Sequence, residues 1–383
     1  MKKVCVITST RAEYGLLSSV IRQINDDSRL QLLLIATGMH LDVNYGETYK
    51  EIEADGFNIH YKISINSDDS EIGILNTIAN GIEKIGKILV SERPDMLVLL
   101  GDRYELLAFA SAAVVLKIPI AHISGGEITE GAFDEYIRHA ITKLSMLHFV
   151  STEEYRNRVI QMGENPKRVF NVGDLGVFNV NNLVKFSKEE VERRIEMHIG
   201  KYLVQVTFHP ETLSNNSIEQ FSELLKALEE NINLQIVFTK ANADLNGKVI
   251  NSMIDDFVKK NSDRAKAFYS LGYKMFLSLL SYSFAIIGNS SSGIVEAPSL
   301  RIGTINIGDR QKGRTRAKST IDCEGKKEEI LKSIDKLKSK EFQDELRNLN
   351  SPYESDDTAR KIVCQMRDYL YNNNHISKSF FDL

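Results

Sequence analysis

The amino-acid sequence predicts the α/β fold class, with two Rossmann-like domains that face a cleft. Short apolar segments of strand length alternate with longer segments of helical periodicity, and this alternation favours β-α-β units with a parallel sheet. The alternation occurs twice along the chain, on either side of a polar segment at residues 174–187. The length of 383 residues also suits two domains of roughly 150–200 residues better than a single core.

Residues 1–173 are expected to form the N-terminal Rossmann-like domain. Its buried strands are predicted at Lys3–Ile7, Gln31–Ala36, Met96–Leu100, Ile118–Ile123, Leu147–Val150 and Val169–Val172. Helical periodicity connects these strands, most clearly over Tyr14–Asn25, Gly73–Ser91 and Glu105–Leu116. In parallel sheets of this kind ligands bind outside the carboxyl ends of the strands, so the residues directly after each strand matter most for function.

Residues 187–357 are expected to form the C-terminal Rossmann-like domain, after an interdomain linker at 174–187. Its strands are predicted at Tyr202–Thr207, Gln235–Phe238, Ala265–Phe268, Phe284–Ile287 and Gly303–Ile307. Helices are predicted at Ser217–Glu230 and Gly272–Ser281, and helical periodicity returns at residues 341–349. A last helical segment, residues 358–372, is expected to pack back on the N-terminal domain.

The composition argues against several classes of protein. A net charge of -4 gives no electrostatic footprint for nucleic acid or for an anionic membrane surface. No apolar run approaches the roughly 20 residues of a membrane span, and the N-terminal residues do not form a signal peptide. Cys5, Cys323 and Cys364 show neither metal-ligand spacing nor a disulfide framework. We therefore expect a cytoplasmic protein with no nucleic-acid or membrane partner.

The clearest functional signal follows the predicted strand at 284–287. A turn of small polar residues leads from this strand into a helix-compatible segment that carries Glu296. We call the turn the serine turn; it comprises Gly288, Asn289, Ser290, Ser291, Ser292 and Gly293. Exposed N–H groups and the positive end of a helix dipole favour anions at such a place. Glu296 can accept hydrogen bonds from paired sugar hydroxyls, so a nucleotide diphosphate-sugar is indicated.

Carboxylates follow neighbouring strands of the N-terminal domain. Asp102 comes directly after a strand and a glycine, Glu127 follows two glycines, and Asp134 opens a helix whose next turn carries Arg138 and His139. Each has an ordinary structural explanation, because aspartate caps helices and acidic residues in a first turn complement the helix dipole. Crowded carboxylates can also divide acid and base roles between them, which makes all three candidates for catalysis.

Cations and histidines complete the set of candidates. Arg11 follows the first strand and has the planar fork that suits a phosphate, although it can equally be a surface arginine. His40 follows the second strand and His209 ends a strand before Pro210, and neither is a strong signal alone. Arg314 belongs to a cationic loop at residues 308–316 that could complement a diphosphate. No P-loop, zinc spacing or acidic metal site is apparent, so we expect neither a metal nor a cofactor.

Several motifs together resemble one enzyme family, the hydrolysing UDP-N-acetylglucosamine 2-epimerases. They lie at residues 9–14, 37–40, 101–105, 122–127, 134–143, 208–212, 288–293 and 306–314. A non-hydrolysing branch follows its glutamate with Ala-Gly-Leu-Arg, whereas Ile128-Thr129-Glu130 follows Glu127 here. This departure favours the hydrolysing branch. The resemblance covers residues 1–320 and implies a glycosyltransferase-B type fold, in which the second domain holds most of the nucleotide.

The resemblance also implies a reaction. UDP-N-acetylglucosamine would lose UDP by elimination across C1–C2, and hydration of the resulting 2-acetamidoglucal would give N-acetylmannosamine. Asp102, Glu127 and Asp134 would stabilise the sugar cation and move protons, with the individual roles left open. His209 would assist departure of UDP, which Arg11, Arg314, Glu296 and the serine turn would hold. His40, Arg138 and His139 would contact the sugar.

Two alternatives remain open from the sequence. A sister group of hydrolysing enzymes acts on UDP-N,N'-diacetylbacillosamine in legionaminic acid synthesis and shares nearly every motif. A glycosyltransferase of the same fold is an alternative from a different class of enzyme. The family resemblance also implies a homodimer or a homotetramer as the functional assembly.

Overall fold

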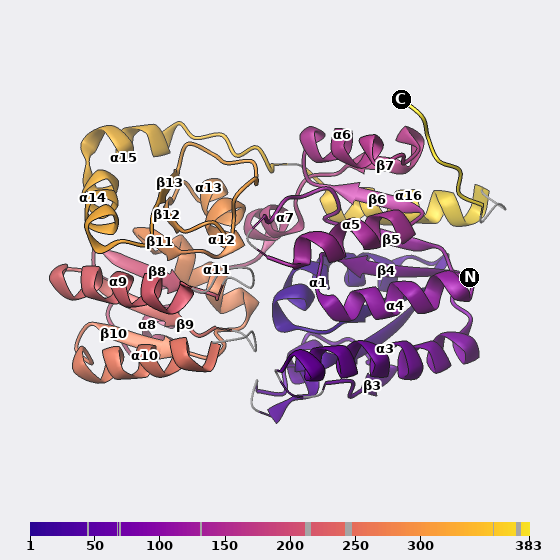
Figure 1. Ribbon diagram of the computed structural model, residues 1–383, viewed down its shortest axis with the longest axis horizontal. Coiled ribbons are helices and arrows are strands. Elements are labelled where there is room, and N and C mark those ends of the chain that lie inside the picture. Colours follow the sequence, from indigo (N-terminus) through magenta and orange to yellow (C-terminus); the bar gives the residue numbers. More distant parts are fainter. Residues whose placement is uncertain are drawn as a thin grey trace. The chain divides into compact units, whose positions relative to one another are not determined.

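The computed structural model describes residues 1–43, 46–66, 68, 70–130, 132–210, 216–241, 247–354, 356–372 and 377–383. The chain forms two compact α/β units (Figure 1). Unit 1 comprises residues 1–127, 134–179 and 355–383, and unit 2 comprises residues 128–133 and 180–354. Each unit contains one parallel sheet, which confirms the predicted α/β class.

Unit 1 has a seven-stranded sheet in the order β3-β2-β1-β4-β5-β6-β7. The strands are β1 (Lys2–Thr8), β2 (Leu30–Thr37), β3 (Tyr61–Ile63), β4 (Met96–Leu100), β5 (Ile120–Ile123), β6 (Leu147–Val150) and β7 (Val169–Asn171). The chain builds the sheet outward from β1 in one direction and then from β4 in the other. The carboxyl ends of β1 and β4 are therefore the topological switch point, where ligands bind in sheets of this kind.

Helices cover both faces of this sheet. They are α1 (Arg11–Asp26), α2 (Tyr49–Ala54), α3 (Glu71–Glu92), α4 (Tyr104–Val115), α5 (Asp134–Leu144), α6 (Glu153–Gln161), α7 (Leu175–Asn182) and α16 (Thr358–Asn372). Alternate residues of β1 enter different cores: Val4 and Val6 pack with α1 and α16, whereas Cys5 and Ile7 pack with α3 and α4. Because the centre of β1 is buried on both faces, Val4–Ile7 is a continuous apolar run without alternation.

The last helix returns the chain to unit 1. The apolar face of α16, which includes Ile362 and Met366, joins the same core as α1. Oγ1 of Thr358 donates to the main-chain oxygen of Val172 at 2.8 Å, and Arg367 pairs with Asp27 at 2.6 Å. These contacts fix the first residue and the second half of α16 on unit 1.

The segment predicted as a linker contains helix α7. The carboxylate of Asp174 accepts from the N–H of Gly176 at 2.7 Å and so satisfies a donor at the start of this helix. The side chain of Asn179 donates to the main-chain oxygen of Gly15 at 3.0 Å, which ties α7 to α1. The segment also buries Leu175, Val177 and Val180, so it is an anchored helix and not the polar linker predicted from the sequence.

Unit 2 has a six-stranded sheet in the order β10-β9-β8-β11-β12-β13. The strands are β8 (Leu203–Thr207), β9 (Gln235–Thr239), β10 (Ala265–Phe268), β11 (Ala285–Gly288), β12 (Gly303–Ile307) and β13 (Thr320–Cys323). The helices are α8 (Lys188–Ile195), α9 (Ser217–Glu230), α10 (Gly247–Lys260), α11 (Tyr273–Ser281), α12 (Ser291–Ile294), α13 (Glu296–Ser299), α14 (Lys327–Lys338) and α15 (Lys340–Arg347). The switch point of this sheet lies between β8 and β11.

Two edge strands, β3 and β13, are absent from the sequence prediction. Only three residues form β3, none of them buried, and β13 contains the exposed Asp322. Neither strand offers the continuous apolar run that identifies the central strands. Within the described part of the chain, no helix is both long and apolar enough to cross a membrane.

Candidate active site

The switch point of unit 1 presents two polar turns. Ser9 and Thr10 follow β1, and Gly101 and Asp102 follow β4. Gly101 has a φ of +85°, a conformation that side chains disfavour, and its N–H donates to the main-chain oxygen of Ile123 at 2.9 Å. This turn places Asp102 directly after the strand, as the sequence predicts.

Arg138 on α5 gathers the acidic groups of unit 1. Its guanidinium group forms an ion pair with Asp102 and donates to the main-chain oxygen of Glu127 at 3.1 Å. A third contact joins it to the carboxylate of Glu135 at 3.3 Å, and that carboxylate also contacts Nε2 of His139 at 2.9 Å. The structure therefore brings together four of the predicted residues, and it adds Glu135 as a link between Arg138 and His139.

The exposure of these side chains distinguishes their roles. The Arg138 side chain is 1% exposed, whereas the side chain of Asp102 is 24% exposed. Glu127 is buried, and Oγ of Ser151 lies 3.5 Å from its carboxylate. Asp134 is partly exposed at the first position of α5. The sealed guanidinium suits positioning of the acidic groups better than direct contact with a sugar, which was the role predicted for Arg138.

A buried histidine holds the turn that carries Asp102. Nε2 of His122 on β5 lies 2.8 Å from the main-chain oxygen of Gly101, and Nδ1 lies 3.2 Å from Oγ1 of Thr142 on α5. Burial lowers the pKa of His122 to about 3, so the ring is neutral near pH 7. Because a carbonyl oxygen can only accept, Nε2 carries the proton and Nδ1 accepts from Thr142. Sequence reasoning did not identify this residue as a functional candidate.

His40 lies beneath the surface of unit 1. Its ring is fully buried, with Nε2 3.0 Å from Oγ1 of Thr8 and Nδ1 2.8 Å from Oγ1 of Thr48. Burial lowers the pKa of His40 to about 3, so this ring is also neutral. Both nitrogens are thus occupied by threonines, and the ring connects β1 with the segment before α2. The predicted contact of His40 with a sugar would require these hydrogen bonds to break.

Arg11 and Glu13 lie in the first turn of helix α1. Thr10 is the N-cap of this helix, and its Oγ1 accepts from the N–H of Glu13 at 3.3 Å. Burial lowers the pKa of the partly buried Arg11, against the attraction of Glu51. The carboxylate of Glu13 accepts from the N–H of Ser9 at 2.7 Å and from its Oγ at 2.9 Å. Burial outweighs these bonds and raises the pKa of Glu13 to about 7. A carboxyl group of this kind often serves a functional site, and the sequence alone did not single it out.

In unit 2 the serine turn follows β11, at the switch point beside β8. Gly288 has a φ of +133°, and a Cβ atom there would collide with the main-chain oxygen of Thr207 on β8. That oxygen accepts from the N–H of Asn289 at 3.1 Å. Only glycine therefore allows the chain to leave β11 so close to β8.

Asn289 fixes the main chain of His209. Its Oδ1 accepts from the N–H of His209 at 2.7 Å, and its Nδ2 donates to the oxygen of the same residue at 2.8 Å. The main-chain oxygen of Asn289 accepts in turn from Nε2 of Gln311 at 2.9 Å and from Arg310 at 3.3 Å. The structure thus brings His209, the serine turn and the cationic loop together through Asn289.

The helix after the serine turn differs from the prediction. Two four-residue helices, α12 and α13, replace one continuous helix, and the break falls at Val295. Pro298 explains the break, because it has no N–H to donate to Ile294 and its ring clashes with that carbonyl. Since so short a helix has a small dipole, anion binding would depend more on N–H groups and hydroxyls. Glu296 is buried at the start of α13.

The cationic loop uses part of its charge internally. Arg316 pairs with Asp322 at 2.9 Å and donates to the main-chain oxygen of Arg314 at 2.9 Å, while Lys312 lies 3.8 Å from Glu130. A cavity of about 830 Å³ borders this loop at the ends of β12 and β13, and its lining does not include the serine turn. Arg314 is partly exposed. Within the described residues, no group of three His, Cys, Asp or Glu side chains is arranged to hold a metal ion.

A profile of the family described as UDP-N-acetylglucosamine 2-epimerase matches residues 22–367. The chain belongs to this family. The matched range contains every predicted site residue except Arg11. It also includes β4 of the unit 1 switch point and β11 of the unit 2 switch point. The resemblance inferred from the motifs is thereby confirmed.

Individual relatives match nearly the whole chain. GDP/UDP-N,N'-diacetylbacillosamine 2-epimerase (hydrolyzing) of Campylobacter jejuni is 42% identical over 384 residues, which cover 100% of this chain and 99% of that protein. Polysialic acid biosynthesis protein P7 of Escherichia coli is 39% identical over 386 residues, which cover 100% of this chain and 98% of that protein. The crystal structure of UDP-GlcNAc 2-epimerase from Neisseria meningitidis bound to UDP-GlcNAc matches with a TM-score of 0.81 and 19% identity, covering 96% of this chain and 100% of that one. This last likeness shows a shared fold.

Proposed function

We propose that this member of the epimerase family is a hydrolysing 2-epimerase of a UDP-linked 2-acetamido sugar. The observation that carries the proposal is the acidic group around Arg138 at the switch point of unit 1. A sealed guanidinium holds Asp102, the main chain of Glu127 and Glu135 in place. Such prearranged charge is suited to a sugar cation, and stabilising charge that develops in a transition state is commonly the largest catalytic contribution.

The proposed reaction begins with elimination. The C1–O bond breaks and its electron pair leaves with the β-phosphate oxygen of UDP, so positive charge develops on the sugar ring. Asp102, Glu127 and Asp134 stabilise this charge, and one of them takes the proton from C2 as the C1–C2 double bond forms. The second step adds water: its hydroxyl goes to C1 and a proton returns to the opposite face of C2. The free sugar is the 2-epimer, and UDP is the other product.

We assign the sugar chemistry to unit 1 and most of the nucleotide binding to unit 2. The hydroxyls and N–H groups of Ser290, Ser291 and Ser292 are candidates for binding the diphosphate, together with the guanidinium groups of Arg11 and Arg314. His209, whose main chain is fixed by Asn289, would interact with the β-phosphate as the bond to C1 breaks. Glu296 would accept hydrogen bonds from the ribose hydroxyls. His139, held by Glu135, is the candidate for sugar contact that remains partly exposed.

For the sugar we propose N,N'-diacetylbacillosamine as the preferred substrate. The support is the 42% identity, over the full length of both chains, to a relative named for that sugar. N-acetylglucosamine, the sugar predicted from the motifs, is the second candidate because the family description names it. The two sugars differ at C4 and C6, so groups that line those positions decide between them.

The experiment that tests this proposal omits any acceptor. The purified enzyme is incubated with UDP-N,N'-diacetylbacillosamine or with UDP-GlcNAc, and both UDP and the free sugar are measured. We expect UDP and the 2-epimer in equal amounts, with the higher kcat/KM for the bacillosamine derivative. A higher kcat/KM for UDP-GlcNAc would reverse the substrate assignment. UDP release only after addition of a sugar acceptor would indicate a glycosyltransferase instead.

A further inference from the structure

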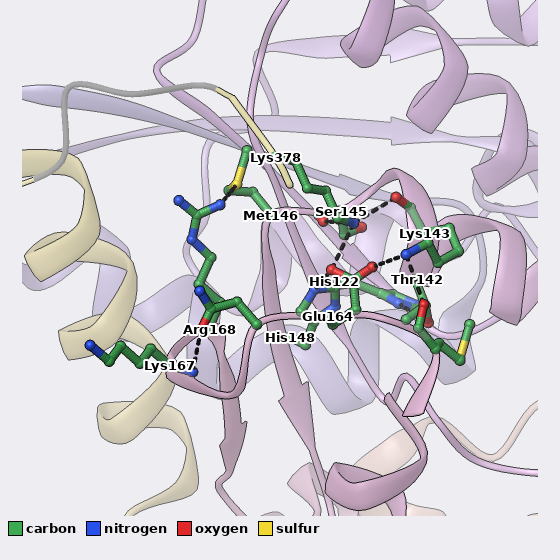
Figure 2. A network of polar contacts seen from close by, with 12 residues as sticks. His122, Thr142, Lys143, Ser145, Met146, His148, Glu164, Lys167, Arg168 and Lys378 are labelled. Atoms are coloured by element: carbon green, nitrogen blue, oxygen red, sulfur yellow. Dashed lines mark hydrogen bonds and ion pairs between the residues drawn. The ribbon is translucent and has the colours of Figure 1, made fainter. Parts of the chain in front are cut away.

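The C-terminal tail, residues 377–383, ends on unit 1 near the last turn of α5. Nζ of Lys378 donates to the main-chain oxygens of Lys143 and Ser145 at 2.6 and 2.7 Å. It also pairs with the carboxylate of Glu164 at 2.7 Å. These three contacts use all three N–H donors of the ammonium group, as Figure 2 shows around Lys378 and Glu164.

Lys378 acts as a cap for α5. The last carbonyls of a helix have no partner within the helix and carry its partial negative charge. The oxygen of Lys143 belongs to this last turn, and that of Ser145 follows directly after it. Lys378 supplies both a donor and a positive charge at this position, although it lies more than 230 residues away in the sequence.

Glu164 connects the tail with the sheet. Its side chain is 3% exposed and accepts from Lys143 at 2.7 Å, from Lys378 at 2.7 Å and from Nε2 of His148 at 2.9 Å. Burial alone would raise the pKa of Glu164, but these donors outweigh it and hold the pKa at about 2. Removing one cation would leave a buried carboxylate with less compensation, which is unfavourable in a low-dielectric interior.

Two routes of contacts lead from this network to the acidic residues around Arg138, which are Asp102, Glu127 and Glu135. The first is α5 itself, which carries Lys143 in its last turn and Arg138 in its middle. The second runs through the sheet, because His148 on β6 is in register with His122 on β5. His122 contacts the main-chain oxygen of Gly101, the residue before Asp102. Both routes end at the ion pair between Arg138 and Asp102.

We propose that Lys378 is a positioning residue for the epimerase reaction, and that it acts by fixing the C-terminal end of α5. The tail thereby sets where Arg138 holds Asp102. Further contacts seat the tail: the N–H of Phe381 donates to the main-chain oxygen of Gly163 at 2.9 Å, and Nζ of Lys143 lies 4.9 Å from the centre of the Phe380 ring. The inference rests on the proposed function for its effect on turnover.

The test compares three variants with the wild-type enzyme. Lys378→Met keeps the length of the side chain and removes its charge, Lys378→Arg keeps the charge, and a truncation removes residues 377–383. Lys332→Met is the matched control, because Lys332 is an exposed lysine of unit 2 that pairs with Glu329 at 2.8 Å. For each protein we would measure kcat, KM, UDP affinity by calorimetry, thermal unfolding, and amide hydrogen exchange over residues 134–144.

We expect Lys378→Met and the truncation to lower kcat by about tenfold to a hundredfold, because small displacements of catalytic groups have effects of this size. UDP affinity should stay within twofold, exchange in α5 should increase, and Lys378→Arg should recover part of kcat. Lys332→Met should match the wild type. A fully folded Lys378→Met enzyme with wild-type kcat would overturn the inference. A decrease in apparent kcat that is fully explained by a smaller fraction of folded enzyme would overturn it as well.

Failure of the proposed function would be visible separately. If the wild-type chain converts neither UDP-sugar, the proposed function is wrong. Amide hydrogen exchange still tests whether Lys378 fixes α5 in that case, because the measurement needs no substrate. Unchanged exchange over residues 134–144 in Lys378→Met would then contradict the proposed contact between the tail and α5.

Discussion

Arg138 is sealed inside unit 1, and its ion-pair partner Asp102 remains partly open. Their side chains are 1% and 24% exposed, respectively. A ligand can therefore reach the carboxylate without reaching the guanidinium group. The same arginine donates to the main-chain oxygen of Glu127, so one buried cation sets the position of two predicted catalytic residues.

Replacing Arg138 by methionine should remove this arrangement. Loss of one partner from a buried ion pair costs about 3–5 kcal/mol of the free energy of unfolding, because the other charge is left uncompensated. We expect such a loss in urea unfolding, and a fall in kcat of at least about a hundredfold under conditions where the variant is folded. Arg193→Met is the control, since Arg193 is 74% exposed and pairs with Glu190 on the surface. Near-normal kcat in folded Arg138→Met would contradict the positioning role.

Asp102→Asn and Glu127→Gln test the chemical roles of the two carboxylates. Each substitution keeps the shape of the side chain and removes its charge, so the developing sugar cation loses stabilisation. We expect each variant to lose nearly all turnover, with a fall of at least about 10²-fold if the residue is the general base. UDP affinity, measured by calorimetry, should remain close to that of the wild type, because most of the nucleotide binding is assigned to unit 2. Normal turnover in either variant would remove that residue from the mechanism.

Asn289→Asp tests the clamp on His209. The aspartate can still accept from the N–H of His209, but it would face the main-chain oxygen of that residue without a donor. We expect UDP to bind at least tenfold more weakly, a change of about 1.4 kcal/mol. Asn251→Asp is a matched control, because Asn251 makes the same pair of contacts to Ala241, at 2.8 and 3.2 Å. Equal losses of UDP affinity in both variants would indicate general destabilisation of unit 2.

The raised pKa of Glu13 predicts a pH dependence of stability. Its pKa is about 7 in the folded chain against an ordinary value of 4.5, so its contribution to stability is fully present below pH 4.5 and is lost as the pH rises through 7. Between pH 4.5 and 8, the free energy of unfolding of the wild type should fall by about 3 kcal/mol relative to that of Glu13→Gln. Urea unfolding of both proteins across this range measures the difference. Parallel pH profiles would show that Glu13 titrates normally.

The positions of many site residues could be predicted because they depend on local sequence. Gly101-Asp102 and Gly288-Asn289 follow apolar strands, and the ends of parallel strands are where ligands bind. Contacts between distant segments left no such local signal. Thr8 and Thr48 enclose His40 from two separate elements, so the sequence could not show that its ring is buried.

Charged networks were the hardest part to predict. The ion pair between Arg138 and Asp102 joins α5 to the end of β4, and the contact of Lys378 with Glu164 joins the tail to the segment after α6. Asp102 and Arg138 were candidates from the sequence, but nothing in it showed that they pair, and Lys378 and Glu164 have the appearance of ordinary surface charges. Only the fold reveals that their partners are buried and that the charges are therefore compensated.

One isotope experiment directly tests elimination of UDP followed by hydration. The enzyme is incubated with UDP-N,N'-diacetylbacillosamine in D₂O without an acceptor, and the free sugar is analysed by NMR and mass spectrometry. Free 2-epimer incubated with enzyme in D₂O serves as the control for later exchange. We predict one deuterium at C2, inverted configuration at that carbon and an equal amount of UDP. A released sugar with hydrogen at C2 and unchanged configuration would contradict the mechanism.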